Sequence, residues 1–199
     1  NKWDFWVYPQ VREIDPKNVL ITDNLDKKSR ETLARGGSVL LLTYGKVGKD
    51  KGARVEIGFS SIFWNTAWTN NQAPHTLGIL CDPANPVFKD FPTEAWSNWQ
   101  WWDPVTHSQA MIVNDLPQEL KPLIQPIDTW FENRKLALAF ESRTGGGKLM
   151  VCSIDMKDMT KERLSSKQLL VSILNYMNSS HFNPEVEVDL GEINSLISN

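Results

Sequence analysis

The sequence predicts an α/β fold of three layers, in which helices cover both faces of a mostly parallel sheet. Residues 19–22 and 38–43 are short apolar runs, and a helix-forming segment, residues 25–35, lies between them. Two strands joined through a helix form a βαβ unit, whose strands are parallel and whose crossover is right-handed. A hairpin over residues 136–154 and a helix over residues 166–178 complete the predicted domain.

Each element of the βαβ unit has its own local signal. Short continuous apolar runs are typical of parallel strands that are buried on both faces. Asp23 or Asn24 can cap the helix by accepting a backbone N–H. Gly36 and Gly37 can take the left-handed conformation that commonly ends a helix, so we expect the helix to end at Arg35.

The remaining elements follow from periodicity and turn residues. Residues 77–81 and 110–113 are rich in β-forming side chains and are further strand candidates. The predicted hairpin has a glycine-rich turn at residues 144–147. In the helix over residues 166–178, the large apolar side chains fall on one face, which would pack against the sheet.

The two ends of the chain differ from this domain. Residues 3–8 are rich in β-forming side chains and are followed by Pro9, which predicts a lone strand and then a linker. This strand would be either the last strand of a preceding β-domain or an edge strand added to the present one. The chain from Phe182 onward is predicted to be a polar tail.

Composition and charge argue against two classes of function. The chain has 199 residues, of which 41% are hydrophobic, and a net charge of −3. This charge creates no positive field, so a nucleic-acid partner is not expected. No apolar run reaches the roughly 20 residues that span a bilayer, so no membrane span is expected. The chain begins at Asn1 without a signal-peptide pattern, and we expect it to be a fragment of a longer protein.

The sequence offers no activated nucleophile. A nucleophile elbow would read Gly-x-Cys-x-Gly or Gly-x-Ser-x-Gly, and neither pattern occurs. Cys81 is followed by Asp82 and Pro83, and the proline has no N–H to stabilise an oxyanion. Cys152 lies inside an apolar run. We expect both cysteines to be buried thiols, and the sequence leaves a disulfide between them open.

Other catalytic and metal-binding patterns are equally weak. The three histidines have no carboxylate or cysteine neighbours at metal-ligand spacing. Glycoside hydrolysis needs two carboxylates that face each other across a sugar ring, and the sequence does not pair its candidates. These candidates are Asp82, Asp103, Glu141 and Asp155. We therefore predict no catalytic residue, no metal and no cofactor.

Tryptophan is the most unusual feature of the chain, with nine residues in all and four of them within residues 96–102. Tryptophan rings can stack on sugar rings, as in a carbohydrate-binding surface. They can also fill a gap inside the protein or a seam with a neighbouring domain, which is the interpretation that we favour. The spacing of Trp96, Trp99 and Trp102 fits one helical or turn-like face, whereas that of Trp99 and Trp101 fits one face of a strand. The candidate contact residues are Trp64, Trp68, Trp96, Trp99, Trp101 and Trp102.

Four ordered motifs resemble the C-terminal region of bacterial glycoside hydrolase family 2 proteins, the β-galactosidase-like enzymes. The motifs are Phe59-Ser-Ser-Ile-Phe-Trp-Asn-Thr-Ala-Trp68, Pro74-His-Thr-Leu-Gly78, Asn85-Pro-Val-Phe-Lys-Asp-Phe-Pro-Thr93 and Trp96-Ser-Asn-Trp-Gln-Trp-Trp-Asp103. Residues 146–155 and the helix after them are similar to the same region. The resemblance covers most of residues 1–182.

This resemblance implies a domain similar to class I glutamine amidotransferases, with a flavodoxin-like sheet but without their nucleophile. Residues 1–15 would be the last strand of a preceding β-sandwich domain plus a linker. Residues 16–182 would form the amidotransferase-like domain, and residues 183–199 a C-terminal tail. The catalytic glutamates of the enzyme family belong to an upstream barrel domain, which no stretch of this chain matches.

The function implied is that of a non-catalytic accessory domain of a glycoside hydrolase, whose parent hydrolyses O-glycosyl bonds in polysaccharide. The domain would support domain packing, assembly or the substrate cleft. The alternative is a carbohydrate-binding module that uses the Trp96–Trp102 segment. The expected partners are the upstream domains of the same polypeptide, polysaccharide and a second copy of the chain. The expected location of the parent is the periplasm or the cell exterior.

Overall fold

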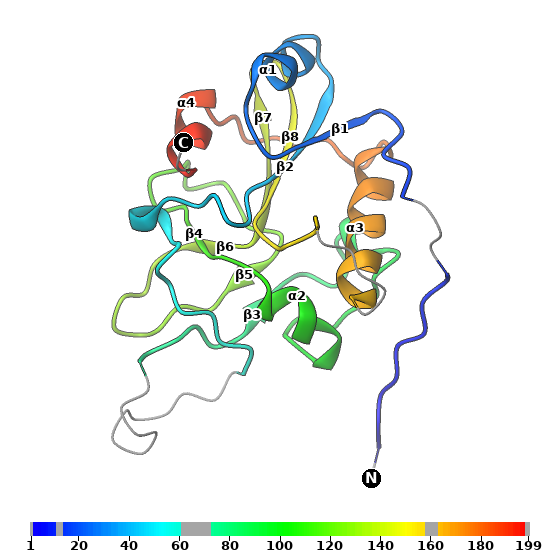
Figure 1. The fold of residues 1–199 in the computed structure, drawn as a ribbon, viewed down its shortest axis with the longest axis vertical. Coiled ribbons are helices and arrows are strands. Elements are labelled where there is room, and N and C mark those ends of the chain that lie inside the picture. The colour runs from blue at the N-terminus through cyan, green and yellow to red at the C-terminus, as the bar shows by residue number, and fades with distance from the viewer. Residues whose placement is uncertain (1, 11–13, 61–72, 158–162, 198–199) are drawn as a thin grey trace.

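A four-stranded mixed sheet forms the centre of the computed structural model, which describes residues 2–10, 14–60, 73–157 and 163–197 (Figure 1). The strands lie in the order β1 (Val19–Thr22), β2 (Ser38–Leu42), β8 (Gly147–Cys152) and β7 (Ala139–Thr144). β1 and β8 both run parallel to β2, whereas β7 is antiparallel to β8. The predicted hairpin is therefore present as β7 and β8.

The predicted βαβ unit is also present. α1 (Lys27–Ala34) connects the parallel strands β1 and β2. Its N-cap is Asp26 rather than Asp23 or Asn24, because the Asp26 carboxylate is the one that accepts a backbone N–H from the first turn, at 2.8 Å. The helix therefore begins two residues later than expected. After the helix the chain turns through Gly36, at φ +78°, which a glycine adopts without strain.

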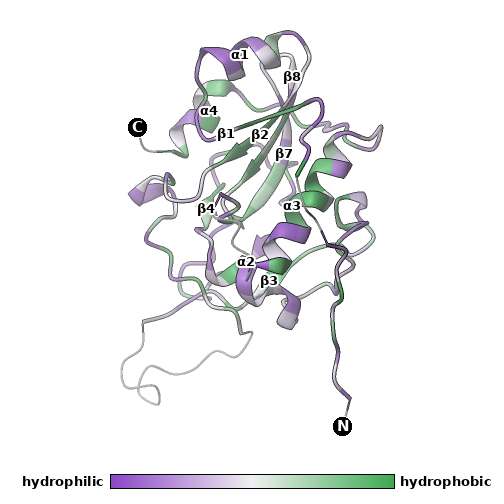
Figure 2. Cartoon of the chain, turned by 45° about the vertical axis from the view of Figure 1, so that its right-hand side comes forward, coloured by the Kyte–Doolittle hydropathy of each residue, from purple (hydrophilic) through white to green (hydrophobic). Residues whose placement is uncertain are grey.

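Alternate residues of the central strands pack into two hydrophobic clusters, because successive side chains of a strand point to opposite faces. Leu40 and Met150 belong to the cluster that includes α3 (Leu164–Met177). Leu41 and Val151 belong to the cluster that includes residues of α1 and α4 (Leu190–Ser195). Figure 2 shows hydrophobic residues along the central strands and on α3. The apolar runs of β2 and β8 are thus buried on both faces of the sheet.

The prediction of a three-layer, mostly parallel sheet of the flavodoxin-like or class I glutamine amidotransferase-like kind is wrong. The central sheet is mixed, and the described chain adds only two small antiparallel pairs to it. These pairs are β3 (Ile79–Leu80) with β5 (Gln125–Pro126), and β4 (Met111–Ile112) with β6 (Leu136–Ala137). A parallel connection needs a crossover of about a dozen residues or more, usually a helix. The described helices between β2 and β7 are too short for this role.

Short helical turns occupy the middle of the chain instead. Three of them are 3-10 turns, namely η1 (Lys49–Lys51), η2 (Pro86–Phe88) and η3 (Trp99–Trp101). α2 (Trp102–Thr106) continues directly from η3. Among the described residues, no helix combines the length and hydrophobicity needed to cross a bilayer.

Residues 2–10 form an extended segment without regular secondary structure, which passes α3 and runs on beyond it (Figure 1). Trp3, Phe5 and Val7 are 78%, 86% and 92% exposed. Tyr8 stacks on Phe91 with the ring centroids 6.3 Å apart, which attaches the segment to the body. That this segment is a strand of a preceding β-sandwich domain stays a prediction.

Residues 183–197, which we expected to belong to a tail, pack against the sheet. Val188 and Leu196 are buried in the cluster that includes α1. The chain before α4 pairs with the outer edge of β7: the Arg143 N–H donates to the Val186 carbonyl oxygen at 2.8 Å, and the Val188 N–H donates to that of Arg143 at 2.9 Å. This segment therefore covers the β7 edge of the sheet.

The close approach of β8 to α1 predicts that Gly147→Ala destabilises the fold. A Cβ at Gly147 would lie 2.6 Å from the Gly37 carbonyl oxygen and 2.7 Å from the Leu33 Cα, so backbone would have to shift. Overpacking of this kind costs about 1–3 kcal/mol. We expect a lower midpoint of urea denaturation. The matched control is Gly48→Ala, whose Cβ would meet nothing closer than 3.5 Å; equal losses in the two variants would contradict the prediction.

Candidate functional site

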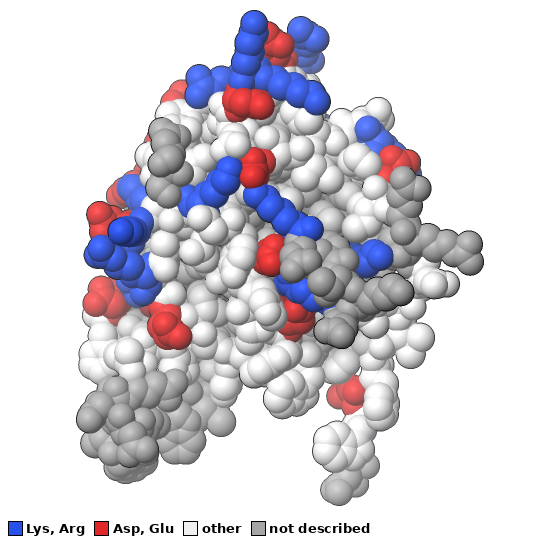
Figure 3. Space-filling view, in the orientation of Figure 1, with Lys and Arg blue, Asp and Glu red and all other residues white. Residues whose placement is uncertain are grey.

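The carboxyl ends of β1, β2 and β8 form the edge of the sheet at which α/β folds usually bind their ligands. Three charged side chains meet there, because Asp23 follows β1, Lys46 follows β2 and Lys157 follows β8. Lys46 Nζ lies 3.1 Å from Asp23 Oδ2, and Lys157 Nζ contacts the same oxygen. Figure 3 shows basic and acidic side chains next to one another on this face. Hydrogen bonds from Lys157 and Lys46 lower the pKa of the Asp23 carboxyl, so this edge carries an ion-pair cluster.

Neither cysteine is activated for nucleophilic chemistry. Both are free thiols. Burial raises the pKa of Cys152 to about 12, and burial together with the charge of Asp82 raises the pKa of Cys81 to about 11. Because the thiolate is the reactive form, both side chains stay protonated and unreactive near neutral pH. In the part of the chain that the structure describes, no three His, Cys, Asp or Glu side chains come together as a metal site.

The tryptophan segment is anchored by Trp101, at the end of η3. Its ring is fully buried in edge-to-face contact with Phe88 and Phe91. Its indole Nε1 donates a hydrogen bond to Thr93 Oγ1 at 2.6 Å. With Trp101 fixed inside, Trp99 and Trp102 face outward, whereas Gln100 is buried.

Trp99 and Trp102 are exposed and pack on the partly buried ring of Phe59, and we call these three rings the aromatic cluster. The ring centroid of Phe59 lies 5.2 Å from that of Trp99 and 5.2 Å from that of Trp102. The centroids of the two indole rings are 5.7 Å apart. Trp99 is 70% exposed and Trp102 is 50% exposed. Each indole is therefore held by two other rings while at least half of the residue's surface remains in water.

The structure separates the six predicted contact residues. Trp99 and Trp102 contact each other, and Trp101 belongs to the core. Trp96, which lies close to them in the sequence, is 57% exposed. Trp64 and Trp68 lie outside the described residues. Trp96, Trp99 and Trp102 are exposed, so they do not fill a gap in the interior of the described structure.

Phe59 is the member of the aromatic cluster that the sequence did not single out. Its only signal was its place at the start of one of the four resemblance motifs. The structure fixes it through the backbone, because the Ser97 hydroxyl donates a hydrogen bond to the Phe59 carbonyl oxygen at 2.9 Å. A side chain 40 positions upstream of Trp99 is thus brought to the same surface.

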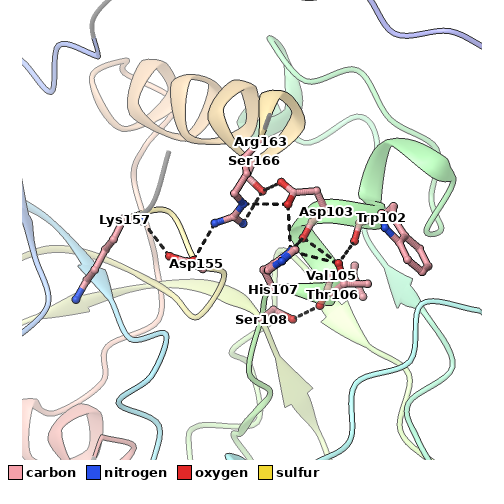
Figure 4. A network of polar contacts seen from close by, with 10 residues as sticks. All are labelled: Trp102, Asp103, Val105, Thr106, His107, Ser108, Asp155, Lys157, Arg163 and Ser166. Carbon is pink, nitrogen blue, oxygen red and sulfur yellow. Dashed lines mark hydrogen bonds and ion pairs between the residues drawn. The ribbon is translucent and has the colours of Figure 1, made fainter. Parts of the chain in front are cut away.

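An ion-pair network next to the aromatic cluster fixes α2 (Figure 4). Asp103, in the first turn of α2, accepts a hydrogen bond from Arg163 Nε at 2.9 Å and another from the Ser166 hydroxyl. The same carboxylate lies 3.1 Å from His107 Nδ1. Arg163 is buried and also donates from Nη1 to Asp155 at 2.8 Å. We call these five residues the Arg163 network.

The Arg163 network accounts for two of the four carboxylates that the sequence offered for glycoside hydrolysis. Asp103 and Asp155 are both held by the guanidinium of Arg163, as structural ion pairs. Asp82 lies in the turn after β3 and accepts a backbone N–H at 3.0 Å. Glu141 lies on β7 and accepts a hydrogen bond from an α3 side chain. Each of these carboxylates thus has a structural role of its own.

The Arg163 network predicts a large loss of stability in Arg163→Met. Removing one partner of a buried ion pair leaves unpaired charges and costs about 3–5 kcal/mol. We expect this loss in urea denaturation, together with stronger quenching of tryptophan fluorescence by iodide as α2 loosens. The control is Arg35→Met, which removes an exposed pair with Glu31 at 4.0 Å and should cost about 1 kcal/mol or less. Similar losses in both variants would show that the network is not structural.

Glu141 has an unusual environment for a carboxyl group. Tyr176 Oη, from α3, donates a hydrogen bond to Glu141 Oε2 at 2.8 Å. Burial raises the pKa of Glu141 above its usual value, and the hydrogen bond from Tyr176 offsets only part of this effect. The folded protein therefore holds the Glu141 proton more tightly than the unfolded chain does.

This raised pKa predicts a pH-dependent effect of Glu141→Gln. The stabilisation from protonated Glu141 is complete below the unfolded pKa of about 4.3 and is lost as the pH rises through the folded value. The glutamine keeps an oxygen that can accept from Tyr176 but carries no charge. We expect a higher melting temperature than that of the parent at pH 7, and no difference at about pH 3.5. Exposed Glu119→Gln is the control, and a gain independent of pH would contradict the assignment.

Comparison with known proteins identifies a family but no activity. No curated protein matches the chain. A family model described as a domain of unknown function, DUF8487, matches residues 20–198. The match begins in β1 and extends through α4, so it includes the aromatic cluster and the Arg163 network. Because the model covers most of its length, the chain belongs to the DUF8487 family.

Proposed function

We propose that the chain is a non-catalytic domain of a glycoside hydrolase and that its aromatic cluster contacts polysaccharide at or beside the substrate cleft of the parent. The observation that carries this proposal is the exposure of Trp99 and Trp102 in a fixed arrangement. A periplasmic or extracellular location and assembly with a second copy are further proposals, which rest on the resemblance alone.

The aromatic cluster has the properties that sugar stacking requires. Indole rings present an electron-rich face, which attracts the C–H groups on the apolar face of a sugar ring. The rings are already ordered, since Trp99 and Trp102 pack on Phe59 and on each other. Binding would therefore cost little additional side-chain entropy.

The backbone beneath the rings is also fixed. Trp101 anchors η3 in the core, and Asp103 ties α2 to Arg163. Two points of attachment thus lie directly beside Trp102 in the sequence. A rigid support of this kind is what a binding surface needs to hold side chains in one geometry.

The chemistry of the described residues supports a non-catalytic role. The two thiols are protonated near neutral pH because burial raises the pKa of both. Asp103 and Asp155 serve as partners of Arg163. The edge of the sheet at which an α/β enzyme would bind its substrate carries the ion pairs of Asp23 with Lys46 and Lys157.

A second surface favours the docking of this domain on an upstream domain. Trp3, Phe5 and Val7 alternate along residues 2–10 and project into water. Large apolar side chains exposed in a row typically mark a contact with another protein surface. Docking through residues 2–10 and sugar binding through the aromatic cluster use different residues, so both can hold.

The polysaccharide proposal predicts that the domain is retarded in affinity gel electrophoresis by at least one soluble polysaccharide of a panel of galactans, xylans, mannans and glucans. The double variant Trp99→Ala/Trp102→Ala should weaken this binding by about tenfold or more, because it removes both stacking surfaces. The control is Trp3→Ala, which removes an exposed indole outside the cluster. Absence of retardation with every polysaccharide, or equal binding by the double variant, would refute sugar binding by the cluster.

A further inference from the structure

We propose that a groove between residues 5–9 and α3 is a second binding site, whose ligand is an uncharged sugar. The groove has a volume of about 540 Å³. Pockets that bind small molecules typically measure about 300–1,000 Å³, so the groove can hold one or two sugar rings. Its walls come from three parts of the chain: the N-terminal segment, residues 89–92 and one side of α3.

The α3 wall carries a row of connected polar groups. Asn175 Nδ2 donates to Asp90 Oδ2 at 2.7 Å, and Gln168 Nε2 donates to the Asp90 carbonyl oxygen at 2.6 Å. These bonds orient both carboxamides and the carboxylate. Each of the three side chains keeps a further oxygen that can accept a hydrogen bond, and adjacent acceptors of this kind suit the neighbouring hydroxyls of a sugar.

Two polar atoms in the walls of the groove have no hydrogen-bond partner among the described residues. They are Gln168 Oε1, in a residue that is only 5% exposed, and Tyr8 Oη. A buried polar atom without a partner costs about 1–3 kcal/mol. A ligand hydroxyl that reaches either atom after a small side-chain rotation would remove this cost, which points to a polar occupant.

The opposite wall is aromatic. Trp6 and Tyr8 line the groove together with Phe5, Val7 and Pro9, and of these Phe5 and Val7 are largely exposed to water. The stacking of Tyr8 on Phe91 fixes this wall relative to the body. An aromatic wall opposite oriented carboxamides matches the two surfaces of a sugar, its apolar C–H face and its ring of hydroxyls.

Charge favours an uncharged ligand over an ion. Lys89 and Asp90 are adjacent, carry opposite charges and both line the groove. Gln168 and Asn175 are neutral. Tyr8 also stays neutral, because burial raises its pKa to about 12. The groove therefore has no excess charge with which to attract an anion or a cation.

This inference rests on residues that the aromatic cluster does not share, so it can hold or fail independently of sugar binding by that cluster. The test is calorimetric titration of the whole chain with glucose, galactose, mannose and xylose and with their β-1,4-linked tetraoses. We expect at least one of these probes to bind with a dissociation constant of about 1 mM or lower. Trp6→Ala and Asn175→Ala should each weaken binding by about tenfold or more.

The control variants separate the two sites. Trp3→Ala, in the same segment but outside the groove wall, and Trp99→Ala/Trp102→Ala should both leave groove binding unchanged. Thermal melting of each variant verifies that it is folded. If no probe binds, or if only the Trp99→Ala/Trp102→Ala variant loses binding, the groove proposal is refuted, and the second result would support the aromatic cluster instead. Loss in Trp6→Ala and Asn175→Ala alone would support the groove and not the cluster.

Discussion

The ion pairs of Arg163 hold together parts of the chain that no regular element connects. One guanidinium bonds Asp103 in α2 and Asp155 after β8, while Arg163 itself leads into α3. α2 has only five residues, too few for an isolated helix to be stable in water. Its position therefore depends on these bonds, on buried Trp101 and on backbone hydrogen bonds such as that from the Asp155 N–H to the His107 carbonyl oxygen, at 2.8 Å. Because a buried charge is costly unless it is paired, the ion pairs favour the observed arrangement of the three segments, in which Trp102 is half exposed to solvent.

The sequence was informative wherever structure is decided by neighbouring residues. The apolar runs of β1 and β2, the Gly36 turn and the hairpin of β7 and β8 were all predicted, because each follows from a local pattern. The further prediction, that these elements belong to a mostly parallel sheet in a three-layer fold, was wrong. Residues 79–80 and 111–112 do form strands, but the direction of a strand depends on its partner and on the connection between them. Without helices long enough for a crossover, these strands pair antiparallel.

In the candidate site, too, the sequence was informative about single segments and uninformative about contacts between segments. Spacing grouped Trp96, Trp99 and Trp102 on one helical face and Trp99 with Trp101 on one strand face, but it did not decide which side chains are buried. The structure buries Trp101 and leaves the other three exposed. Phe59 could not be identified, because its approach to Trp99 depends on a loop contact across 40 residues. The groove was equally hidden, since it exists only where residues 5–9 pass α3. Properties of one segment were thus readable in advance, whereas properties that arise between segments were not.

The two edges of the central sheet differ in a way that limits how the domain can associate. Along β7, the backbone of residues 186–188 already uses the free hydrogen-bonding groups at Arg143. A strand from another molecule would have to displace this segment, together with buried Val188, before it could pair there. β1, at the other end of the strand order, is only four residues long, and a short edge gives an incoming strand few bonds. The domain can therefore carry exposed aromatic side chains at high concentration with little tendency to polymerise through its sheet.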